Sequence, residues 1–338
     1  MPTSDDVCDP PLAESYQALF HDSEKIGQHS YDQDQGIREC ELPLIDLRGL
    51  RSSDGDERRA CVEAIAEASS EWGFFQVLNH GISRELLEEM RREQMKLFRT
   101  PFEKKISSRL LNDSYRWGNP TATSLKQFSW SEAFHVPLAQ ISDKNCCYGE
   151  FSSLREVMEK LAGAMSELAH ILAGALAENL VHNSHGFPDN CNKNTCFLRL
   201  NRYPPCPFSP EAFGLPPHTD SDFLTILHQD QVGGLQLMKE SKWVAVKPNP
   251  DALIVNIGDL FQAWSNDIYK SVEHKVMANG KIERYSIAYF LCPSYGSTIR
   301  SYEEPSLYES FTFGEFRQQV QEDVKRFGQK VGLPRFLL

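Results

Sequence analysis

Residues 214–230 read GLPPHTDSDFLTILHQD, and this stretch joins a strand to a candidate metal site. Residues 223–227 are mostly apolar and aromatic or branched, which is typical of a buried strand. A proline cluster at 204, 205, 207, 210, 216 and 217 comes before it and cannot lie in a central strand. Because residues i and i+2 of an extended backbone point to one face, His218 and Asp220 can reach the same ion.

Short strand-like segments continue on both sides of this stretch, from residue 194 to about residue 292. Turn residues at 230–234 and 277–281 help to separate candidates at 195–203, 223–227, 235–238, 243–246, 253–257 and 285–291. Many short strands between turns predict an all-β core, which is a sandwich, a jelly roll or a barrel. Apolar periodicity predicts helices around that core at about 57–70, 83–98, 152–183 and 312–328, and the third is one long helix or a broken pair.

No clean linker divides the chain, so we expect one compact unit with four segments. Residues 1–40 show little periodicity and are expected to be loosely ordered. Residues 41–193 are expected to form a mostly helical region packed on the core, and residues 194–295 the core itself. Residues 296–338 are expected to add a C-terminal strand and helix that cover the core.

Composition narrows the class of partner. The 338 residues include 35 Lys and Arg against 47 Asp and Glu, which leaves a net charge of −12. This charge argues against a general nucleic-acid binder or an anionic-membrane binder, because phosphate backbones and acidic lipids would repel it. It does not argue against a small anionic substrate, because the local charge of a site is independent of the total.

Cysteine usage and hydropathy indicate the compartment. The nine cysteines are odd in number and contain no CxxC, so they predict neither a disulfide framework nor a structural zinc site. The first twenty residues are acidic and polar, without the basic and apolar regions of a secretory signal. The most apolar long stretch, 161–181, carries Glu167, His170 and Glu178 and is interpreted as a buried helix. We therefore expect a soluble protein with a cytoplasmic location and no membrane association.

A third metal ligand is available at His274, which ends the strand-like Ser271-Val272-Glu273-His274. Two histidines and one carboxylate on one face of a metal leave positions open, an arrangement associated with non-haem Fe(II) and oxygen chemistry. A His-x-Asp pattern alone is weak evidence, because a second copy occurs at His228-Gln229-Asp230. That copy runs directly into a Gly-Gly turn, so we interpret it as structural.

An anion site is indicated by Arg284 and Ser286, which share one face of a strand. A guanidinium and a hydroxyl suit a carboxylate, and an arginine buried among Ile287, Ala288 and Phe290 needs an anionic partner. The alternative is a surface arginine on an edge strand. Asn201 and Tyr203 also share a face, and the Tyr203 hydroxyl could donate to the same anion or could simply pack.

Outside the predicted β core, the aromatic residues Tyr115, Trp117, Phe128, Trp130 and Phe134 either line an apolar pocket or belong to the core. Arg116 and Lys126 are candidate partners for a substrate carboxylate, whereas His182 and His185 are expected to be solvated. The sequence contains no GxGxxG, P-loop or GxSxG motif.

Together these residues resemble the plant 2-oxoglutarate/Fe(II)-dependent dioxygenases over about residues 42–330. The core motifs that carry the resemblance are Asn201-x-Tyr203-Pro204-Pro205-Cys206, His218-x-Asp220, His274 and Arg284-x-Ser286. The N-terminal motifs are Pro43-Leu44-Ile45-Asp46-Leu47, Trp72-Gly73-Phe74-Phe75 and Asn79-His80-Gly81. Within this family, residues 115–120, 129–135 and 214–230 resemble gibberellin 2-oxidases, most closely the subgroup acting on C20 gibberellins. The Leu-Pro-Trp-Lys-Glu-Thr pattern of gibberellin 20-oxidases is absent.

The resemblance implies a mainly β fold, a double-stranded β-helix (jelly roll) with flanking α-helices. It implies that His218, Asp220 and His274 bind Fe(II), with no catalytic residue beyond these metal ligands. The 2-oxoglutarate cosubstrate would contact Arg284, Ser286, Tyr203 and Asn201, and O2 would be the oxidant, with ascorbate in a supporting role. A diterpenoid carboxylate would be the substrate, in a pocket that includes Tyr115, Arg116, Trp117 and Phe134.

The implied reaction is 2β-hydroxylation of a gibberellin, which inactivates this plant hormone. One alternative is the same iron chemistry in a gibberellin 3- or 20-oxidase or a flavonoid-type dioxygenase. A remoter alternative is a jelly-roll binding protein without catalytic activity. The sequence leaves the oligomeric state open.

Overall fold

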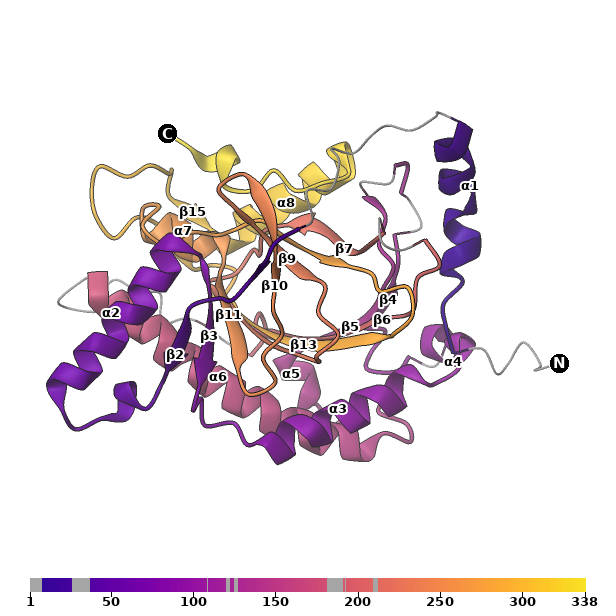
Figure 1. Ribbon diagram of the computed structural model, residues 1–338, viewed down its shortest axis with the longest axis horizontal. Coiled ribbons are helices and arrows are strands. Elements are labelled where there is room, and N and C mark those ends of the chain that lie inside the picture. Colours follow the sequence, from indigo (N-terminus) through magenta and orange to yellow (C-terminus); the bar gives the residue numbers. More distant parts are fainter. Residues whose placement is uncertain are drawn as a thin grey trace.

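The fold is built from two β-sheets that face each other (Figure 1). Residues of both sheets line one cavity. The computed structural model describes residues 8–25, 37–107, 109–119, 122–124, 127–180, 191, 193–208 and 212–338. The smaller sheet has the order β1 (Glu39–Cys40), β10 (Lys242–Val246), β9 (Leu235–Lys239), β12 (His274–Met277) and β7 (Phe213–His218). The larger sheet has the order β2 (Leu44–Asp46), β3 (Phe74–Leu78), β11 (Leu253–Ile257), β8 (Leu224–Gln229), β13 (Arg284–Leu291), β6 (Phe197–Tyr203), β5 (Glu132–Pro137) and β4 (Tyr115–Trp117).

The chain changes sheet at almost every step of the core. β7 lies in the smaller sheet, β8 in the larger, β9 and β10 in the smaller, β11 in the larger, β12 in the smaller and β13 in the larger. Neighbouring core strands are antiparallel. This alternation winds the chain as a double-stranded β-helix, so the predicted jelly roll is confirmed.

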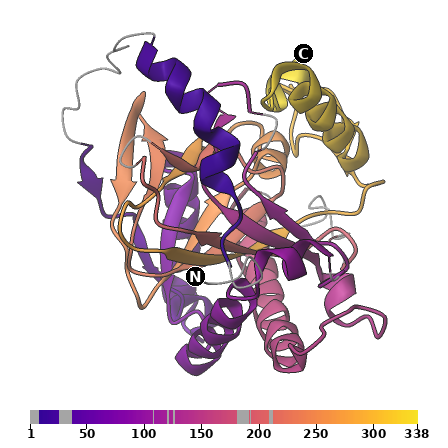
Figure 2. The same ribbon diagram turned by 90° about the vertical axis from the view of Figure 1, so that its right-hand side faces the viewer.

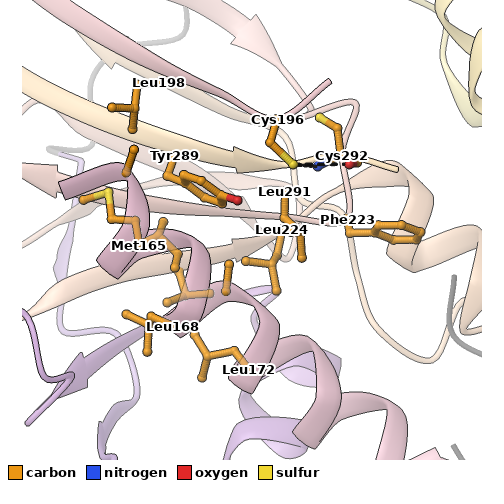
Figure 3. Close-up of a cluster of buried hydrophobic side chains, with 14 of the residues drawn as sticks. Met165, Leu168, Leu172, Cys196, Leu198, Phe223, Leu224, Tyr289, Leu291 and Cys292 are labelled. Carbon is orange, nitrogen blue, oxygen red and sulfur yellow. Dashed lines mark hydrogen bonds between the residues drawn. The ribbon is translucent and has the colours of Figure 1, made fainter. Parts of the chain in front are cut away.

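Helices cover the outer face of the larger sheet. The long helix α6 (Ser152–Leu180) is one continuous element and packs on β8 and β13, with α2 (Gly55–Glu71) and α3 (Arg84–Phe98) beside it (Figures 1 and 2). Its apolar stripe lies against Leu198, Leu224 and Leu291 of the sheet (Figure 3). All of these side chains are fully buried, and burying one Leu stabilises the fold by about 1.5–3 kcal/mol.

The remaining elements are short or lie at the edges. A small ladder pairs β14 (Thr298–Ile299) with β15 (Phe311–Thr312), and α8 (Phe313–Phe327) follows it directly. The others are α4 (Phe102–Ser107), α5 (Leu138–Ile141), α7 (Asp259–Trp264), η2 (Gly49–Arg51) and η4 (Leu333–Phe336). No helix in the described part of the chain has the length and apolar character needed to cross a bilayer.

The N-terminal segment differs from the sequence expectation. Residues 1–40 were expected to be loosely ordered, but the structure forms a helix, α1 (Leu12–Lys25), within the described part of that segment. Leu12 and Tyr16 are one helical turn apart and pack against Phe128 and Trp130. These partners lie more than 100 residues away along the chain, so local periodicity could not reveal the helix.

The N-terminal motif Trp72-Gly73-Phe74-Phe75 leads from the end of α2 into β3, which extends the larger sheet beside β11. Gly73 has φ +62°, a backbone conformation that residues other than glycine rarely adopt. A Cβ there would also lie 2.2 Å from the Lys270 carbonyl oxygen. The glycine therefore lets the end of α2 turn tightly into β3, which places Phe74 inside the cavity.

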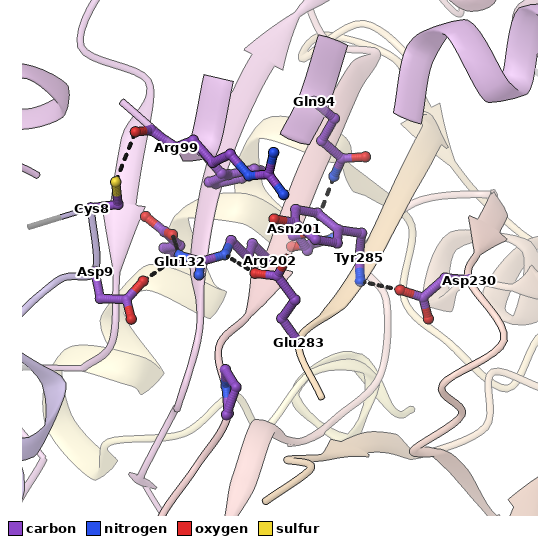
Figure 4. A network of polar contacts seen from close by, with 12 residues as sticks. Cys8, Asp9, Gln94, Arg99, Glu132, Asn201, Arg202, Asp230, Glu283 and Tyr285 are labelled. Carbon is purple, nitrogen blue, oxygen red and sulfur yellow. Dashed lines mark hydrogen bonds and ion pairs between the residues drawn. The ribbon is translucent and has the colours of Figure 1, made fainter. Parts of the chain in front are cut away.

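An ionic network closes the outer face of the larger sheet beside β5 and β6; we call it the outer-face network (Figure 4). Glu132 lies at its centre and accepts from Lys105 and Arg202, and neither the Glu132 nor the Lys105 side chain is exposed. Arg202 also pairs with Asp9 and Glu283, at 2.7 and 3.0 Å. Each buried cation of this network therefore has a carboxylate supplied by the chain itself.

Candidate active site

Three potential metal ligands meet on the cavity side of the smaller sheet. His218 ends β7, His274 begins β12, and these two residues are directly opposite each other in the strand register. Asp220 follows β7, and its Oδ1 lies 3.6 Å from His218 Nε2 and 3.8 Å from His274 Nε2. Among the described residues, this is the one group of His, Cys, Asp or Glu side chains arranged to hold a metal ion, with ligand atoms within 4.8 Å of one another.

Hydrogen bonds aim all three ligands at the same point. The Nδ1 atoms of His218 and His274 lie 2.9 and 3.1 Å from the carbonyl oxygens of Pro216 and Val272. A carbonyl can only accept, so each Nδ1 donates to it, and Nε2 is the ring nitrogen that faces the metal position. Phe74 packs edge-on against the His274 ring, with 5.2 Å between centroids, and this contact limits ring rotation.

Asp220 is held in the same way. Its Oδ2 accepts from Thr225 Oγ1 at 2.6 Å and from Asn256 Nδ2 at 2.8 Å, which leaves Oδ1 facing the two histidines. Thr225 lies on β8 and Asn256 on β11, so the larger sheet orients a ligand that the smaller sheet carries. The sequence analysis missed both of these positioning residues.

The electrostatics favour the metal-binding protonation states. Burial and the neighbouring His274 lower the pKa of His218, so its imidazole is neutral near pH 7. Burial alone would raise the pKa of Asp220, but the two histidines and the Thr225 and Asn256 hydrogen bonds lower it below its usual value. Two imidazole nitrogens and one carboxylate, with further positions open to the cavity, suit the coordination chemistry of non-haem Fe(II).

A second polar cluster lies across the cavity on the larger sheet. In the ladder between β13 and β6, Arg284 is directly opposite Tyr203, and Ser286 is directly opposite Asn201. The structure thus brings together the four side chains predicted to contact 2-oxoglutarate, and all four are buried and line the cavity. The Arg284 guanidinium stacks over the Tyr203 ring, 4.9 Å from its centroid.

Arg284 has polar neighbours but no acidic one among the described residues. Its Nη2 donates to Gln229 Oε1 at 2.7 Å and its Nη1 to Ser286 Oγ at 3.4 Å, while its buried Nε atom has no partner. A guanidinium this deeply buried needs an anion. Together with the Ser286 hydroxyl, it can donate hydrogen bonds to the carboxylate of a ligand.

Two features keep this cluster in place. Gln94 of α3 donates to the backbone carbonyl oxygens of Asn201 and Ser286, at 3.1 and 2.9 Å, and so ties β6 to β13. Gly214 leaves room for Tyr203, because a Cβ there would lie 2.6 Å from the tyrosine ring. Neither role had a signal in the sequence, since both depend on contacts between distant segments.

The metal-ligand cluster and the polar cluster around Arg284, which we call the arginine cluster, share one cavity of about 380 Å³. This volume is within the usual range for a small-molecule site. Apolar side chains cover the wall between the two clusters: Phe74, Leu215, Leu227, Leu235 and Val276. The far end is lined by His135, Phe197, Arg199, Phe290 and Arg317, which the sequence analysis also missed. Strand alternation could have indicated Arg199, because it shares a face with Asn201 and Tyr203.

The residues predicted for the substrate pocket lie elsewhere. Phe134 is fully buried in the core beside Phe98, and the Tyr115 hydroxyl donates to Glu132 in the outer-face network. Arg116 is exposed and donates to backbone carbonyls, and Trp117 packs edge-on against Phe102. None of these four side chains lines the cavity that holds the metal cluster, and Tyr115, Arg116 and Trp117 line a separate hollow. Lys126, His182 and His185 lie outside the described residues.

In the second His-x-Asp copy, His228 lies near the end of β8 and Asp230 begins the turn that follows, as interpreted. Asp230 accepts from the backbone N–H of Val232 and of Tyr285, at 3.0 and 2.6 Å, and both of its oxygens are used in this way. His228 lines a different hollow, beside His80 and Arg91. The same three-residue pattern thus serves a site at one end of β8 and a turn at the other.

Comparisons with known proteins agree with this geometry. A family model described as the 2OG-Fe(II) oxygenase superfamily matches residues 194–293. A second, described as the N-terminal region of non-haem dioxygenases in morphine synthesis, matches residues 42–152. Both metal-ligand strands and the arginine cluster fall within the first of these ranges.

Several curated relatives match nearly the whole chain. Gibberellin 2-beta-dioxygenase 6 of Oryza sativa subsp. japonica is 58% identical, covering 99% of this chain and 98% of its own. Gibberellin 2-beta-dioxygenase 8 of Arabidopsis thaliana is 57% identical, covering 97% and 98%. Gibberellin 20 oxidase 1-B of Triticum aestivum is 35% identical, covering 81% and 80%. Among solved structures, JOX2 in complex with 2OG, Fe and JA has a TM-score of 0.72 and 31% identity, covering 93% of this chain and 94% of that one.

Proposed function

The chain belongs to the 2OG-Fe(II) oxygenase superfamily, and on that premise we propose that it is a gibberellin 2-beta-dioxygenase. It would hydroxylate a gibberellin at C-2 on the β face and so inactivate the hormone. The observation that carries the proposal is one cavity that holds the His218, Asp220 and His274 cluster and Arg284, which has no acidic partner among the described residues. Two gibberellin 2-beta-dioxygenases are 58% and 57% identical to this chain over nearly its full length, whereas a gibberellin 20 oxidase is 35% identical over 81% of it. This difference supports the gibberellin substrate class and favours 2β-hydroxylation over 20-oxidation.

We propose C20 gibberellins as the preferred substrates. This finer assignment rests on the resemblance of residues 115–120, 129–135 and 214–230 to the subgroup that acts on C20 gibberellins. We also propose a cytosolic location, which the odd cysteine number without CxxC supports.

In this proposal His218, Asp220 and His274 hold Fe(II). The bound metal supplies activation of O2 coupled to oxidation of 2-oxoglutarate, which is the difficult part of the chemistry. The protein's part begins with the ligands themselves. The Nδ1 hydrogen bonds fix the histidine tautomers, and Thr225 and Asn256 fix the carboxylate, so the metal keeps one orientation toward the cavity.

Arg284 and Ser286 would bind the distal carboxylate of 2-oxoglutarate, with Tyr203 and Asn201 beside them. Their location on the larger sheet, opposite the metal cluster, lets a short dicarboxylate reach from one sheet to the other. The apolar wall around Phe74 and Leu235 excludes water from the space between and offers a surface for the hydrocarbon body of the substrate. The protein thus positions the C–H bond that is to react.

The test of function is a product assay. We expect the purified chain, given Fe(II), 2-oxoglutarate, ascorbate and O2, to convert gibberellins to 2β-hydroxylated products, identified by mass spectrometry against standards. Presenting C20 and C19 gibberellins at equal concentration decides the preference through their relative kcat/KM. Products hydroxylated at C-3, oxidised at C-20, or formed only from a flavonoid panel would overturn the assignment. An absence of 2-oxoglutarate decarboxylation under all conditions would point to a binding protein instead.

The metal assignment has its own readout. We expect His218→Ala or Asp220→Ala to lose bound iron and to reduce turnover by more than about 1,000-fold, because two ligands cannot hold the ion in place. Iron content is measured by mass spectrometry of the purified protein. The matched control is His228→Ala in the second His-x-Asp, which should bind iron like the wild type. Normal iron content after replacement of His218 would contradict the assignment.

A further inference from the structure

Two arginines lie at the end of the cavity farthest from Arg284, and the proposed function gives neither of them a role. Arg199 lies on β6 and Arg317 on α8, and both line the cavity. In the strand register Arg199 is opposite Ala288, four residues beyond Arg284 on β13. Four residues of extended strand span about 13 Å, so this end is separate from the Arg284 cluster.

Neither arginine is neutralised by the described part of the chain. Arg199 donates through Nε to Asn201 Oδ1 at 2.9 Å, and no carboxylate within salt-bridge distance is recorded for its guanidinium there. Arg317 has no acidic residue three or four positions away on α8, and among the described residues it forms no recorded ion pair. The nearby Glu315 is used in the helix capping box, where it accepts from Thr312.

Arg199 and Arg317 both lie close enough to His135 to affect its pKa. His135 lies on β5 directly opposite Arg199, and burial together with Arg199, Arg317 and Arg116 lowers its pKa to about 4. The imidazole is therefore neutral near pH 7, and the charged groups that lower its pKa are all arginines. Cations that are partly removed from water in this way favour an anionic ligand.

An apolar wall adjoins the two arginines. The His135 ring stacks on Phe197 at 3.9 Å between centroids, and Phe197 stacks on Phe290 at 4.3 Å with an interplanar angle of 12°. These rings form a continuous aromatic surface on β5, β6 and β13. A rigid hydrocarbon that carries a carboxylate matches both parts of this end of the cavity.

We infer that Arg199 and Arg317 bind the carboxylate of the organic substrate while the His135, Phe197 and Phe290 rings hold its apolar body. This inference rests on the proposed function, which makes the substrate a diterpenoid carboxylate. It assigns the two carboxylates in the cavity to different arginines: Arg284 takes that of 2-oxoglutarate, and Arg199 with Arg317 takes that of the gibberellin. Arg199 and Arg317 are thus assigned as specificity residues for the organic substrate.

The test compares a gibberellin with its methyl ester, which has the same body but no charge. For the wild type we expect the acid to have a KM about 10- to 100-fold lower than the ester, the range given by a charge-assisted hydrogen bond. Arg199→Gln and Arg317→Gln should each raise the KM of the acid about 10-fold or more and leave that of the ester unchanged. Arg199→Lys should recover part of the loss, because it keeps the charge without the planar fork.

Controls separate this inference from the proposed function. Arg317→Gln should keep the wild-type KM for 2-oxoglutarate and the wild-type rate of substrate-free decarboxylation. Arg199→Gln also removes the hydrogen bond to Asn201, so for this variant the decisive readout is the difference between acid and ester. Arg326→Gln, an exposed position on the same helix, should change none of these values. Equilibrium dialysis of labelled gibberellin without O2 gives a binding readout that does not depend on turnover.

The outcomes are distinct. If gibberellin binds but is not hydroxylated, the proposed function fails and the dialysis of the variants still decides the inference. If the wild type hydroxylates gibberellin but both variants keep the wild-type KM for the acid, the inference fails alone. Equal losses for acid and ester would also overturn it, because they would indicate a structural role. If no gibberellin binds to the wild type, both proposals fail.

Discussion

Arg199 and Arg202 stand three residues apart on β6 and point to opposite faces of the larger sheet. On the outer face Arg202 meets Glu132, Asp9 and Glu283, and the network is closed (Figure 4). On the cavity face Arg199 and Arg284 meet only amide and hydroxyl groups in the described part of the chain. Arginine on the outer face therefore has carboxylate partners from the chain, and arginine on the cavity face has none among the described residues.

The difference separates stability from binding. A buried cation with an internal carboxylate contributes to the folded state, and removing its partner leaves an uncompensated charge. A buried cation without one lowers stability until a ligand brings the anion, so its energy is available for binding. Variants on the outer face should change the free energy of unfolding, and variants on the cavity face should change ligand affinity.

The largest effect is expected at Glu132. Glu132→Gln removes the carboxylate that Lys105, Arg202 and Tyr115 share, and leaves two buried cations without it. We expect a loss of about 3–5 kcal/mol in the free energy of unfolding, measured by urea denaturation of the iron-free protein. The protein that remains folded should keep the wild-type KM for 2-oxoglutarate.

The matched control is Asp251→Asn, which removes the carboxylate of the exposed Arg84–Asp251 ion pair. Solvent screens that pair, so the expected loss is below about 1 kcal/mol. If Glu132→Gln is no more destabilising than Asp251→Asn, the outer-face network does not have the structural role assigned to it.

Arg284 should show the opposite behaviour. Arg284→Gln removes a buried charge that has no acidic partner among the described residues, so we expect the unfolding free energy without ligand to stay equal or rise. The KM for 2-oxoglutarate should increase about 10- to 100-fold, because a charge-assisted bond to the carboxylate is lost. Steady-state kinetics and urea denaturation measure the two quantities on one preparation.

Ligand-induced stabilisation gives a second measurement of the same contrast. Millimolar 2-oxoglutarate with Mn(II) in place of iron should raise the Tm of the wild type and of Asp251→Asn, but raise that of Arg284→Gln much less. An unchanged KM together with a large loss of stability would place Arg284 with Arg202 as a structural cation, and the contrast between the faces would be wrong.

The sequence predicted the cavity face better than the outer face, and the reason is periodicity. His218 with Asp220 and Arg284 with Ser286 are i and i+2 pairs on strands, so the spacing alone places each pair on one face. The alternation of short strands and turns from residue 194 onward likewise indicated the β core. Patterns within one strand or helix can be read from the chain, because the geometry of that element is known in advance.

What the sequence missed depends on contacts between distant segments. Arg317 reaches the cavity from α8, more than 100 residues after Arg199, and Thr225 and Asn256 orient Asp220 from two other strands. Tyr115 and Phe134, which lie outside the lining of the metal cavity, illustrate the same limit. They resembled a pocket lining because they are aromatic, but burial in the core and a hydrogen bond to Glu132 account for both.

His228, a histidine outside the metal cavity, should affect stability and not ligand binding. It belongs to the second His-x-Asp, lies partly buried at the end of β8, and lines a hollow with His80 and Arg91. Burial, Arg91 and His80 lower its pKa to about 4. As the pH falls below 6.5, the ordinary value for histidine, the unfolded chain takes up a proton that the folded chain does not. Stability is therefore lost as the pH falls from about 6.5 toward 4.

The smallest effect follows from this shift. Between pH 7.5 and pH 5 we expect the wild type to lose about 2 kcal/mol of unfolding free energy that His228→Gln does not lose, because glutamine does not titrate. Urea denaturation at the two pH values measures the difference, and iron content and KM for 2-oxoglutarate should stay at wild-type values. Parallel pH dependence in the two proteins would contradict the buried neutral histidine. A loss of iron in His228→Gln would instead show that His228 supports the metal cluster, and it would then belong with the residues of the cavity.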